Sequence, residues 1–203
     1  MAGRDKILSL LRRIYGPTGE KAYGRIGRLL AEFPAREPSK RKYFSEADVV
    51  LITYGDSLKR SGEKPIKTIH RFAKTYLQGI FSAIHFLPFF PYSSDDGFSV
   101  IDFKAIDADL GSWDDVHKIQ DDFALMFDLV LNHISARSDW FARYLRGEKG
   151  FNELAIEVDR DQDLGSVVRP RTLPLLTEFA RADSSRVNVW TTFSDDQIDL
   201  NYK

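Results

Sequence analysis

The segment from Phe127 to His133, FDLVLNH, places polar side chains that can bind a ligand within an apolar run. A carboxylate in an apolar run is costly to bury unless it has a partner, so Asp128 requires one. Active sites of parallel α/β folds lie at the carboxyl ends of strands, which predicts a site at Asn132 and His133. An ordinary buried strand with a hydrogen-bonded aspartate is the alternative.

A second candidate lies in the loop PYSSDDGFSVIDF, which follows the apolar run GIFSAIHFLPFF. An aromatic face packs on the C–H face of a sugar, and a neighbouring carboxylate accepts hydrogen bonds from sugar hydroxyls. Asp95 and Phe98 therefore form a candidate sugar subsite. A polar turn with one aromatic anchor is the alternative for this loop.

Farther along the chain, Arg169 and Arg171 flank a proline in the triplet RPR. Two guanidinium groups so close together can bind phosphate or carboxylate through paired hydrogen bonds. A surface loop is the simpler interpretation of such a triplet. The triplet is thus an anion-binding candidate whose meaning depends on its neighbours.

Other ligand-binding motifs are excluded by their spacing. Asp159, Asp161 and Asp163 alternate as in a calcium loop. Such a loop needs glycine at its sixth position and a carboxylate at its twelfth, where this chain has Leu164 and Pro170. The four histidines form no HExxH motif, and no glycine-rich phosphate or dinucleotide motif is present. The sequence therefore predicts no metal site and no cofactor.

The composition is that of a globular protein without a dominant charge. The chain has 203 residues, of which 43% are hydrophobic, and a net charge of -1. No overall field attracts nucleic acid or an anionic membrane, and the absence of cysteine fits a reducing compartment. No run is long enough for a signal segment or a membrane span. We therefore expect a cytoplasmic protein that binds neither nucleic acid nor membrane.

Alternating strand and helix patterns must position the candidate residues. Strands are predicted at about 48–54, 80–87 and 125–132, and helical spacing runs from Ile66 to Tyr76. A capping box at Ser112 opens another helix before the third strand. Strands that are apolar on both faces and separated by helices are typical of a parallel sheet covered by helices. The pattern therefore predicts an α/β fold.

Two further segments flank this region. The first contains an amphipathic helix with apolar residues from Ile7 to Ile14, and a second helix from about Thr18 to Phe33. After His133 one helix is predicted from about Ser138 to Arg146, and a polar stretch follows. We therefore divide the chain into a helical extension (1–45), the first strand–helix units (46–133) and an inserted module (134–203).

Five segments stand in the order HFLPFFPYSSDDGF, IDADLGSWDDV, FDLVLNHIS, RPRTLPLLT and VWTTFSDDQIDLNY. This series, within about Asp48 to Lys203, resembles family 13 glycoside hydrolases, the α-amylase superfamily, and within it the sucrose phosphorylases and their relatives. The resemblance implies the N-terminal part of a (β/α)8 TIM barrel, with about three strands. A small inserted domain B would follow strand 3.

The resemblance also implies roles for the residues of the first two candidates. Asp95 and His133 would hydrogen-bond the glucosyl unit next to the scissile bond, and Phe98 would stack beside it. Asp128 would be the buried aspartate at the head of the family's DxxxNH motif. Asn132 would be its companion.

For the later segments, the resemblance implies that Arg171 is a phosphate ligand, Phe193 an aromatic wall, and Gln197 a residue on the acceptor side. The segment QIDLN is similar to the family's QPDLN-like motif, with Ile198 in place of proline. This ending, the helical extension and the WTTF segment resemble relatives acting on glucosylglycerate or phosphorylated sucrose more than the sucrose-specific enzymes.

The implied activity transfers a glucosyl group from an α-glucoside (sucrose, sucrose phosphate or glucosylglycerate) to inorganic phosphate, giving glucose 1-phosphate. Retention requires two catalytic carboxyl groups about 5–5.5 Å apart. In the family these follow the fourth and fifth barrel strands, and residues 1–203 contain no GxRxDA-like nucleophile motif. We therefore expect this chain alone to be an inactive fragment that needs the C-terminal half of the barrel. A family 13 hydrolase fragment and a non-catalytic sugar-binding remnant are the alternatives.

Overall fold

The computed structural model describes residues 2–33, 44–159, 161–168, 172 and 174–202. Residues 1–44 and 45–203 form two compact units, and each is described by itself. No helix among the described residues combines the length and the apolar character that a membrane crossing requires.

The first unit is a pair of helices, α1 (Ala2–Tyr15) and α2 (Gly19–Glu32), joined by the 3-10 turn η1 (Gly16–Thr18). Both predicted helices are therefore confirmed. Gly19 allows the close approach of the two helices, because a Cβ there would lie 2.7 Å from the backbone nitrogen of Arg12.

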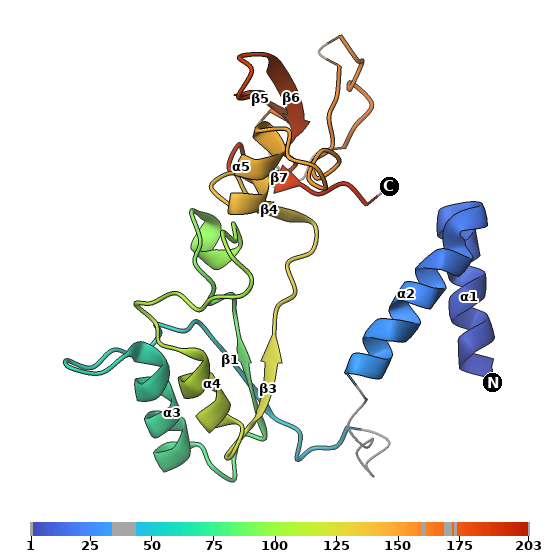
Figure 1. Cartoon of the computed structure of the whole chain (residues 1–203). Helices are drawn as coiled ribbons and strands as arrows, with labels where there is room; N and C mark the ends of the chain where they lie inside the picture. The colour runs from blue at the N-terminus through green and yellow to red at the C-terminus, as the bar shows by residue number, and fades with distance from the viewer. Residues whose placement is uncertain (1, 34–43, 160, 169–171, 173, 203) are drawn as a thin grey trace. The chain divides into compact units, whose positions relative to one another are not determined.

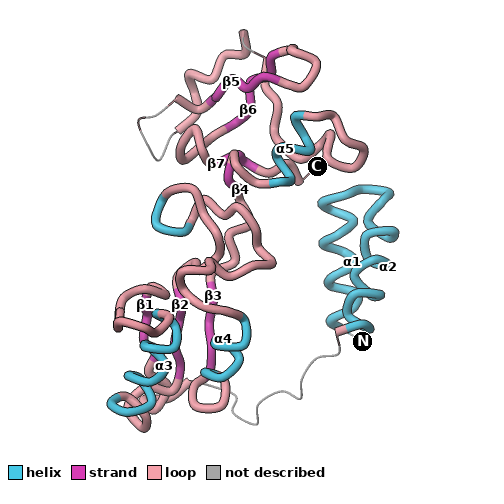
Figure 2. Tube along the Cα trace, turned by 60° about the vertical axis from the view of Figure 1, so that its left-hand side comes forward, coloured by secondary structure: helices cyan, strands magenta, loops and turns pink. Residues whose placement is uncertain are grey.

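The second unit begins with a three-stranded parallel sheet in the order β1 (Val50–Thr53), β2 (Ala83–Phe86) and β3 (Ala124–Phe127). Helices α3 (Pro65–Tyr76) and α4 (Trp113–Ile119) lie on the same side of this sheet (Figures 1 and 2). The α/β prediction with three parallel strands is confirmed. No closed barrel forms within the part of the chain that the structure describes.

The core of this part lies between the sheet and its two helices. Ile84 and Phe86 of β2 are buried against apolar side chains of α3 and α4, among them Ile66, Ile69 and Ile119. The capping box predicted at Ser112 is present, and it fixes the start of α4. Burial of one sheet face thus anchors the strands whose ends carry the candidate site.

The opposite face of the sheet is open. Parallel register aligns Ile52, His85 and Met126 across the three strands. Ile52 is 61% exposed and Met126 is 46% exposed, whereas Ile84 on the covered face is fully buried. The described residues therefore leave apolar strand surface in contact with solvent, which is unusual for a parallel sheet.

The third strand is shorter than the pattern predicts. The predicted strand 125–132 was wrong at its end, because β3 stops at Phe127 and leaves Leu129 73% exposed. Beyond β3 the chain pairs elsewhere, since the Asn132 carbonyl accepts a hydrogen bond from the Leu200 amide. The residues from Asp128 to Asn132 therefore form a connection and not the end of a strand.

The rest of the unit follows this connection. Strand β4 (His133–Ser135) pairs antiparallel with β7 (Gln197–Asp199), and between them lie helix α5 (Asp139–Leu145) and the hairpin β5 (Leu176–Ala180) and β6 (Arg186–Trp190). This segment has its own cluster of buried residues: Ile134, Phe141, Tyr144, Ala155, Val187, Val189 and Ile198. The helix from Ser138 was predicted, but the hairpin was not. The division into first barrel units and an inserted domain stays a prediction.

The uncovered sheet face predicts that the 203-residue chain binds a hydrophobic dye. Replacing Ile52 and Met126 by serine should reduce dye fluorescence while changing the free energy of unfolding by less than about 0.5 kcal/mol each, because both are exposed. The matched control is Ile84→Ala on the covered face, which should lower that free energy by about 2–5 kcal/mol. Dye fluorescence that does not respond to the double substitution would contradict the assignment.

Candidate functional site

A cavity of about 670 Å³ lies beyond the carboxyl ends of the parallel strands. Tyr54 directly follows β1, and Asp128 directly follows β3. Carboxyl ends of parallel strands are where α/β folds bind ligands, because successive strands bring their following loops to one edge. The lining residues are Tyr54, Asp95, Asp96, Phe98, Asp128, Leu129, Val130, Leu131, Asn132, His133 and Phe193.

The partner that Asp128 requires is a histidine of the neighbouring strand. His85 Nε2 lies 3.2 Å from Asp128 Oδ2, and both side chains are largely shielded from solvent. His85 is aligned with Met126 in the sheet, so its side chain shares a face with that of Asp128, two positions farther along the chain. The contact fixes one carboxylate at the edge of the cavity.

Asp95 is presented by a sharply bent loop. The 3-10 turn η2 (Asp95–Gly97) has left-handed backbone at three successive residues, with φ of 57° at Asp95, 50° at Asp96 and 102° at Gly97. At Gly97 a Cβ would lie 2.6 Å from the Pro88 carbonyl oxygen, so only glycine fits. The Phe98 amide then donates to the Asp95 carbonyl oxygen at 3.0 Å.

Gln197 supports this loop from β7. Its side chain is fully buried, and its Nε2 donates to Asp95 Oδ2 at 3.0 Å. The same nitrogen lies 3.2 Å from His133 Nε2, and Gln197 Oε1 accepts from the Ser194 hydroxyl at 2.9 Å. Both the nitrogen and the oxygen of the Gln197 side-chain amide therefore form hydrogen bonds, as expected for a buried polar group.

His133 joins the loop to the aromatic side of the cavity. Its Nε2 lies 3.1 Å from the Phe98 carbonyl oxygen, and its ring centroid lies 5.1 Å from that of Phe193. The imidazole is therefore fixed by neighbours on two sides. A carboxylate, an imidazole and an aromatic ring in one cavity suit a ring-shaped ligand with several hydroxyl groups.

The structure brings most of the predicted residues together, although their roles stay predictions. Gln197 contacts Asp95 from behind and does not line the cavity, so its predicted place on the acceptor side stays untested. Arg171 lies outside the described residues. The six that line the cavity are Asp95, Phe98, Asp128, Asn132, His133 and Phe193.

Two groups near the cavity were not predicted from the sequence. Tyr54 lines the cavity at the end of β1, and aromatic residues are common enough in strands to give no signal. Asp196 accepts hydrogen bonds from serine hydroxyls of the Asp95 loop. Its partners lie about a hundred positions away, so no local spacing could have indicated them.

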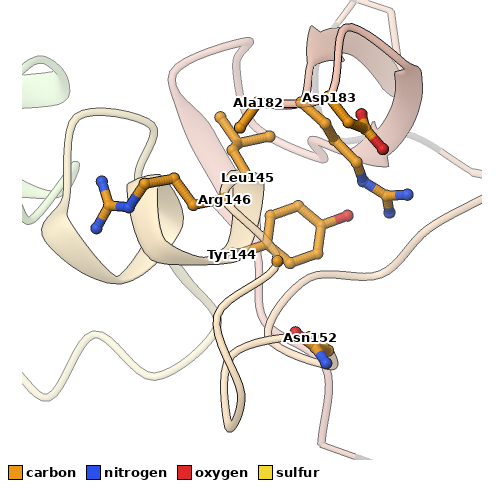
Figure 3. A pocket seen from close by; sticks show the side chains of 8 residues that line it. Tyr144, Leu145, Arg146, Asn152, Ala182 and Asp183 are labelled. Atoms are coloured by element: carbon orange, nitrogen blue, oxygen red, sulfur yellow. The ribbon is translucent and has the colours of Figure 1, made fainter.

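A smaller cavity of about 280 Å³ lies between α5 and the β5–β6 turn (Figure 3). The Tyr144 hydroxyl donates to Glu157 Oε1 at 2.8 Å, and Arg181 pairs with the same oxygen at 2.6 Å. Figure 3 shows the Arg146 guanidinium pointing away from Tyr144. Because Arg181 is paired with Glu157 and Arg146 with Glu148, the guanidinium groups of this cavity are already occupied, and it offers a ligand less than the first one.

Burial of its phenol raises the pKa of Tyr144 to about 12. The described residues contain no group of three or more His, Cys, Asp or Glu side chains arranged to hold a metal ion. The polar and aromatic side chains that line the larger cavity offer a ligand hydrogen bonds and aromatic contact.

Fold and site together define a class of protein: an α/β domain of the barrel type with a polar and aromatic cavity at the carboxyl ends of its strands. Residues 73–203 match the family model of the α-amylase catalytic domain. The chain therefore belongs to the α-amylase family.

Within this family, the chain is similar to several phosphorylases. The chain is 48% identical to a glucosylglycerate phosphorylase of Spirochaeta thermophila over 98% of the chain and 35% of that protein. It is 32% identical to a sucrose phosphorylase of Streptococcus mutans over 75% of the chain and 33% of that protein. The chain thus spans about a third of the length of the curated relatives it matches.

A solved structure confirms the likeness of the fold. The crystal structure of sucrose 6F-phosphate phosphorylase from Thermoanaerobacter thermosaccharolyticum is matched with a TM-score of 0.67 at 33% identity. The match covers 78% of this chain and 34% of that chain. The described fold is therefore that of the corresponding third of a family member.

The raised pKa of Tyr144 predicts a pH-dependent stability. The phenol ionises at about 12 in the folded chain and at about 10 when unfolded. Because the folded pKa is the higher one, this contribution is complete below about pH 10 and is lost as the pH rises towards 12. Denaturation at several pH values should show that loss, and Tyr144→Phe should reduce it. Tyr76→Phe, which removes an exposed phenol, is the control and should retain the loss. An equal loss in wild type and Tyr144→Phe would contradict the assignment.

Proposed function

We propose that this chain forms the glucosyl-binding part of a retaining glycoside phosphorylase, which transfers a glucosyl group from an α-glucoside to inorganic phosphate and gives glucose 1-phosphate. The observation that carries the proposal is the match to a glucosylglycerate phosphorylase over 98% of the chain. That match includes the α1–α2 unit, whereas the match to a sucrose phosphorylase covers 75%. Glucosylglycerate is therefore the proposed α-glucoside.

The geometry of the larger cavity supports a glucosyl ligand. The Asp95 carboxylate, fixed by Gln197, can accept hydrogen bonds from two sugar hydroxyls. The Phe98 ring offers an apolar face to the C–H side of the sugar, and His133 adds a polar contact from β4. Together these residues would hold the ring in a single orientation, which a transfer at the anomeric carbon requires.

The proposed task of this chain is binding and orientation. The carboxylates of Asp95 and Asp128 are held by Gln197 and His85, respectively. Neither is therefore proposed as the nucleophile or the acid, which retention places about 5–5.5 Å apart. We propose that both groups come from the part of the barrel that follows residue 203 in the relatives.

The remaining assignments belong to the same proposal. Its substrates are the α-glucoside and inorganic phosphate, with Arg171 as phosphate ligand, Phe193 as aromatic wall and Asn132 beside the site. Residues 46–133 would be the first barrel units, and 134–203 the inserted domain B. A cytoplasmic location is proposed because the chain contains no cysteine.

Joining this chain to the remaining two thirds of the Spirochaeta relative tests the proposal. The joined protein should release glucose 1-phosphate from glucosylglycerate and phosphate, and the 203-residue chain alone should not. Asp95→Asn should lower kcat/KM by about 10- to 100-fold, because a hydrogen bond to a charged group is lost. Asp121→Asn, at an exposed aspartate that does not line the cavity, is the control and should stay within about twofold.

Three outcomes would each contradict a part of this proposal. Turnover by the 203-residue chain alone would place the bond-breaking groups within it. A joined protein in which Asp95→Asn and the control Asp121→Asn behave alike would remove Asp95 from the glucosyl subsite. A joined protein that hydrolyses the glucoside at the same rate with and without phosphate would favour a hydrolase.

Substitution of Arg171 would distinguish phosphorolysis from hydrolysis. In the joined protein, Arg171→Ala should abolish most phosphate-dependent turnover, because a guanidinium binds phosphate in a bidentate manner. Hydrolysis of the same glucoside should persist, since water needs no anion site. Arg186→Ala, at an exposed arginine of β6, is the control and should retain both activities. Equal loss of both activities in Arg171→Ala would contradict its role as phosphate ligand.

A further inference from the structure

Asp196 accepts hydrogen bonds from serine hydroxyls of a loop that is distant in the sequence. Its Oδ2 accepts hydrogen bonds from Ser94 Oγ at 2.6 Å, from Ser99 Oγ at 2.8 Å and from Ser93 Oγ. The Asp196 carbonyl oxygen also accepts from Ser99 Oγ at 3.1 Å. One carboxylate thus bonds three side chains that lie about a hundred positions earlier in the chain.

These serines stand at the two ends of the loop that carries the sugar-binding candidates. Ser93 and Ser94 precede Asp95, and Ser99 follows Phe98. Backbone hydrogen bonds also join the two ends of this loop. The Ser93 amide donates to the Ser99 carbonyl at 3.0 Å, and the Ser99 amide donates to the Ser94 carbonyl at 3.3 Å. Asp196 therefore holds the base of the loop.

The loop needs such an external hold. Asp95 and Asp96 both adopt left-handed backbone, which residues with a side chain rarely adopt and which costs free energy. A carboxylate suits the task, because it only accepts, offers several lone pairs and makes stronger hydrogen bonds than a neutral group. An amide at this position would bring two donor hydrogens towards hydroxyls that already donate.

We propose that Asp196 is a positioning residue for glucosyl binding, which keeps the Ser93–Ser99 loop in the conformation that presents Asp95 and Phe98 to the sugar. The inference rests on the proposed function only for the identity of the ligand. The hold on the loop is independent of which reaction follows.

A positioning role has a distinct kinetic signature. If the loop is competent only part of the time, the apparent dissociation constant rises in proportion to the loss of competent molecules. Once the sugar is bound, the loop is ordered and the reaction proceeds as before. KM therefore rises while kcat is retained. A merely structural role would instead reduce the number of folded molecules, which lowers the apparent kcat and leaves KM unchanged.

The first experiment measures amide hydrogen exchange in the 203-residue chain. Asp196→Asn should speed exchange at the Phe98 and Ser99 amides by about tenfold or more, while exchange in the β5–β6 hairpin stays unchanged. Asp195→Asn is the matched control, because Asp195 is the exposed neighbour. Should Asp196→Asn fail to fold, Ser94→Ala removes one of the three donors and should give a smaller change in the same direction.

The second experiment uses the chain joined to the remainder of the Spirochaeta relative. Asp196→Asn should raise KM for glucosylglycerate about tenfold and leave kcat within about twofold, because the charge that strengthens the three serine contacts is lost. Unchanged loop exchange together with unchanged KM would overturn the inference, as would a fall in kcat at constant KM. A wild-type joined protein without phosphorolysis would refute the proposed function, and the exchange result would still decide the role of Asp196.

Discussion

The contact between the Gln197 amide and the Asp95 carboxylate joins segments 102 residues apart, and the candidate site depends on it. Gln197 is fully buried, so its side-chain amide cannot exchange its hydrogen bonds for water without a cost in free energy. Strand β7 is paired with β4, which carries His133. The pairing of β4 with β7 therefore brings Gln197, and through it the Asp95 carboxylate, next to the His133 imidazole. The neighbouring Asp196 strengthens the same connection through serine hydroxyls.

Only one face of the three-stranded sheet is covered by the described residues. Helices α3 and α4 cover one face, where Ile84 and Phe86 are buried. The other face exposes Ile52 and Met126 and carries the His85–Asp128 contact towards the cavity. In a barrel this face would point to the interior, where side chains from other strands fill the space. The openness of the face agrees with a chain that spans about a third of its relatives.

Periodicity in the sequence predicts much of this fold, because burial on one face leaves a repeating apolar pattern. The three strands, the α1–α2 pair and the cap at Ser112 were all predicted. The β5–β6 hairpin was missed because its segment is polar overall, although Val187 and Val189 alternate with polar residues as in a half-buried strand. The positions of Asp95, Phe98 and His133 followed from motifs, but the support from Asp196 did not, because its partners are distant in sequence. Long-range contacts between polar groups leave no periodic trace.

We propose that this chain holds a glucosyl unit through Asp95, Phe98 and His133 without groups that break its bond. Titration of the 203-residue chain with D-glucose, followed by the backbone amide signals in NMR, tests the claim directly. We expect concentration-dependent shifts at these three residues, and at Gln197 behind them, while signals of the β5–β6 hairpin stay fixed. Shifts confined to other residues, or no shift at these positions at any glucose concentration, would contradict it.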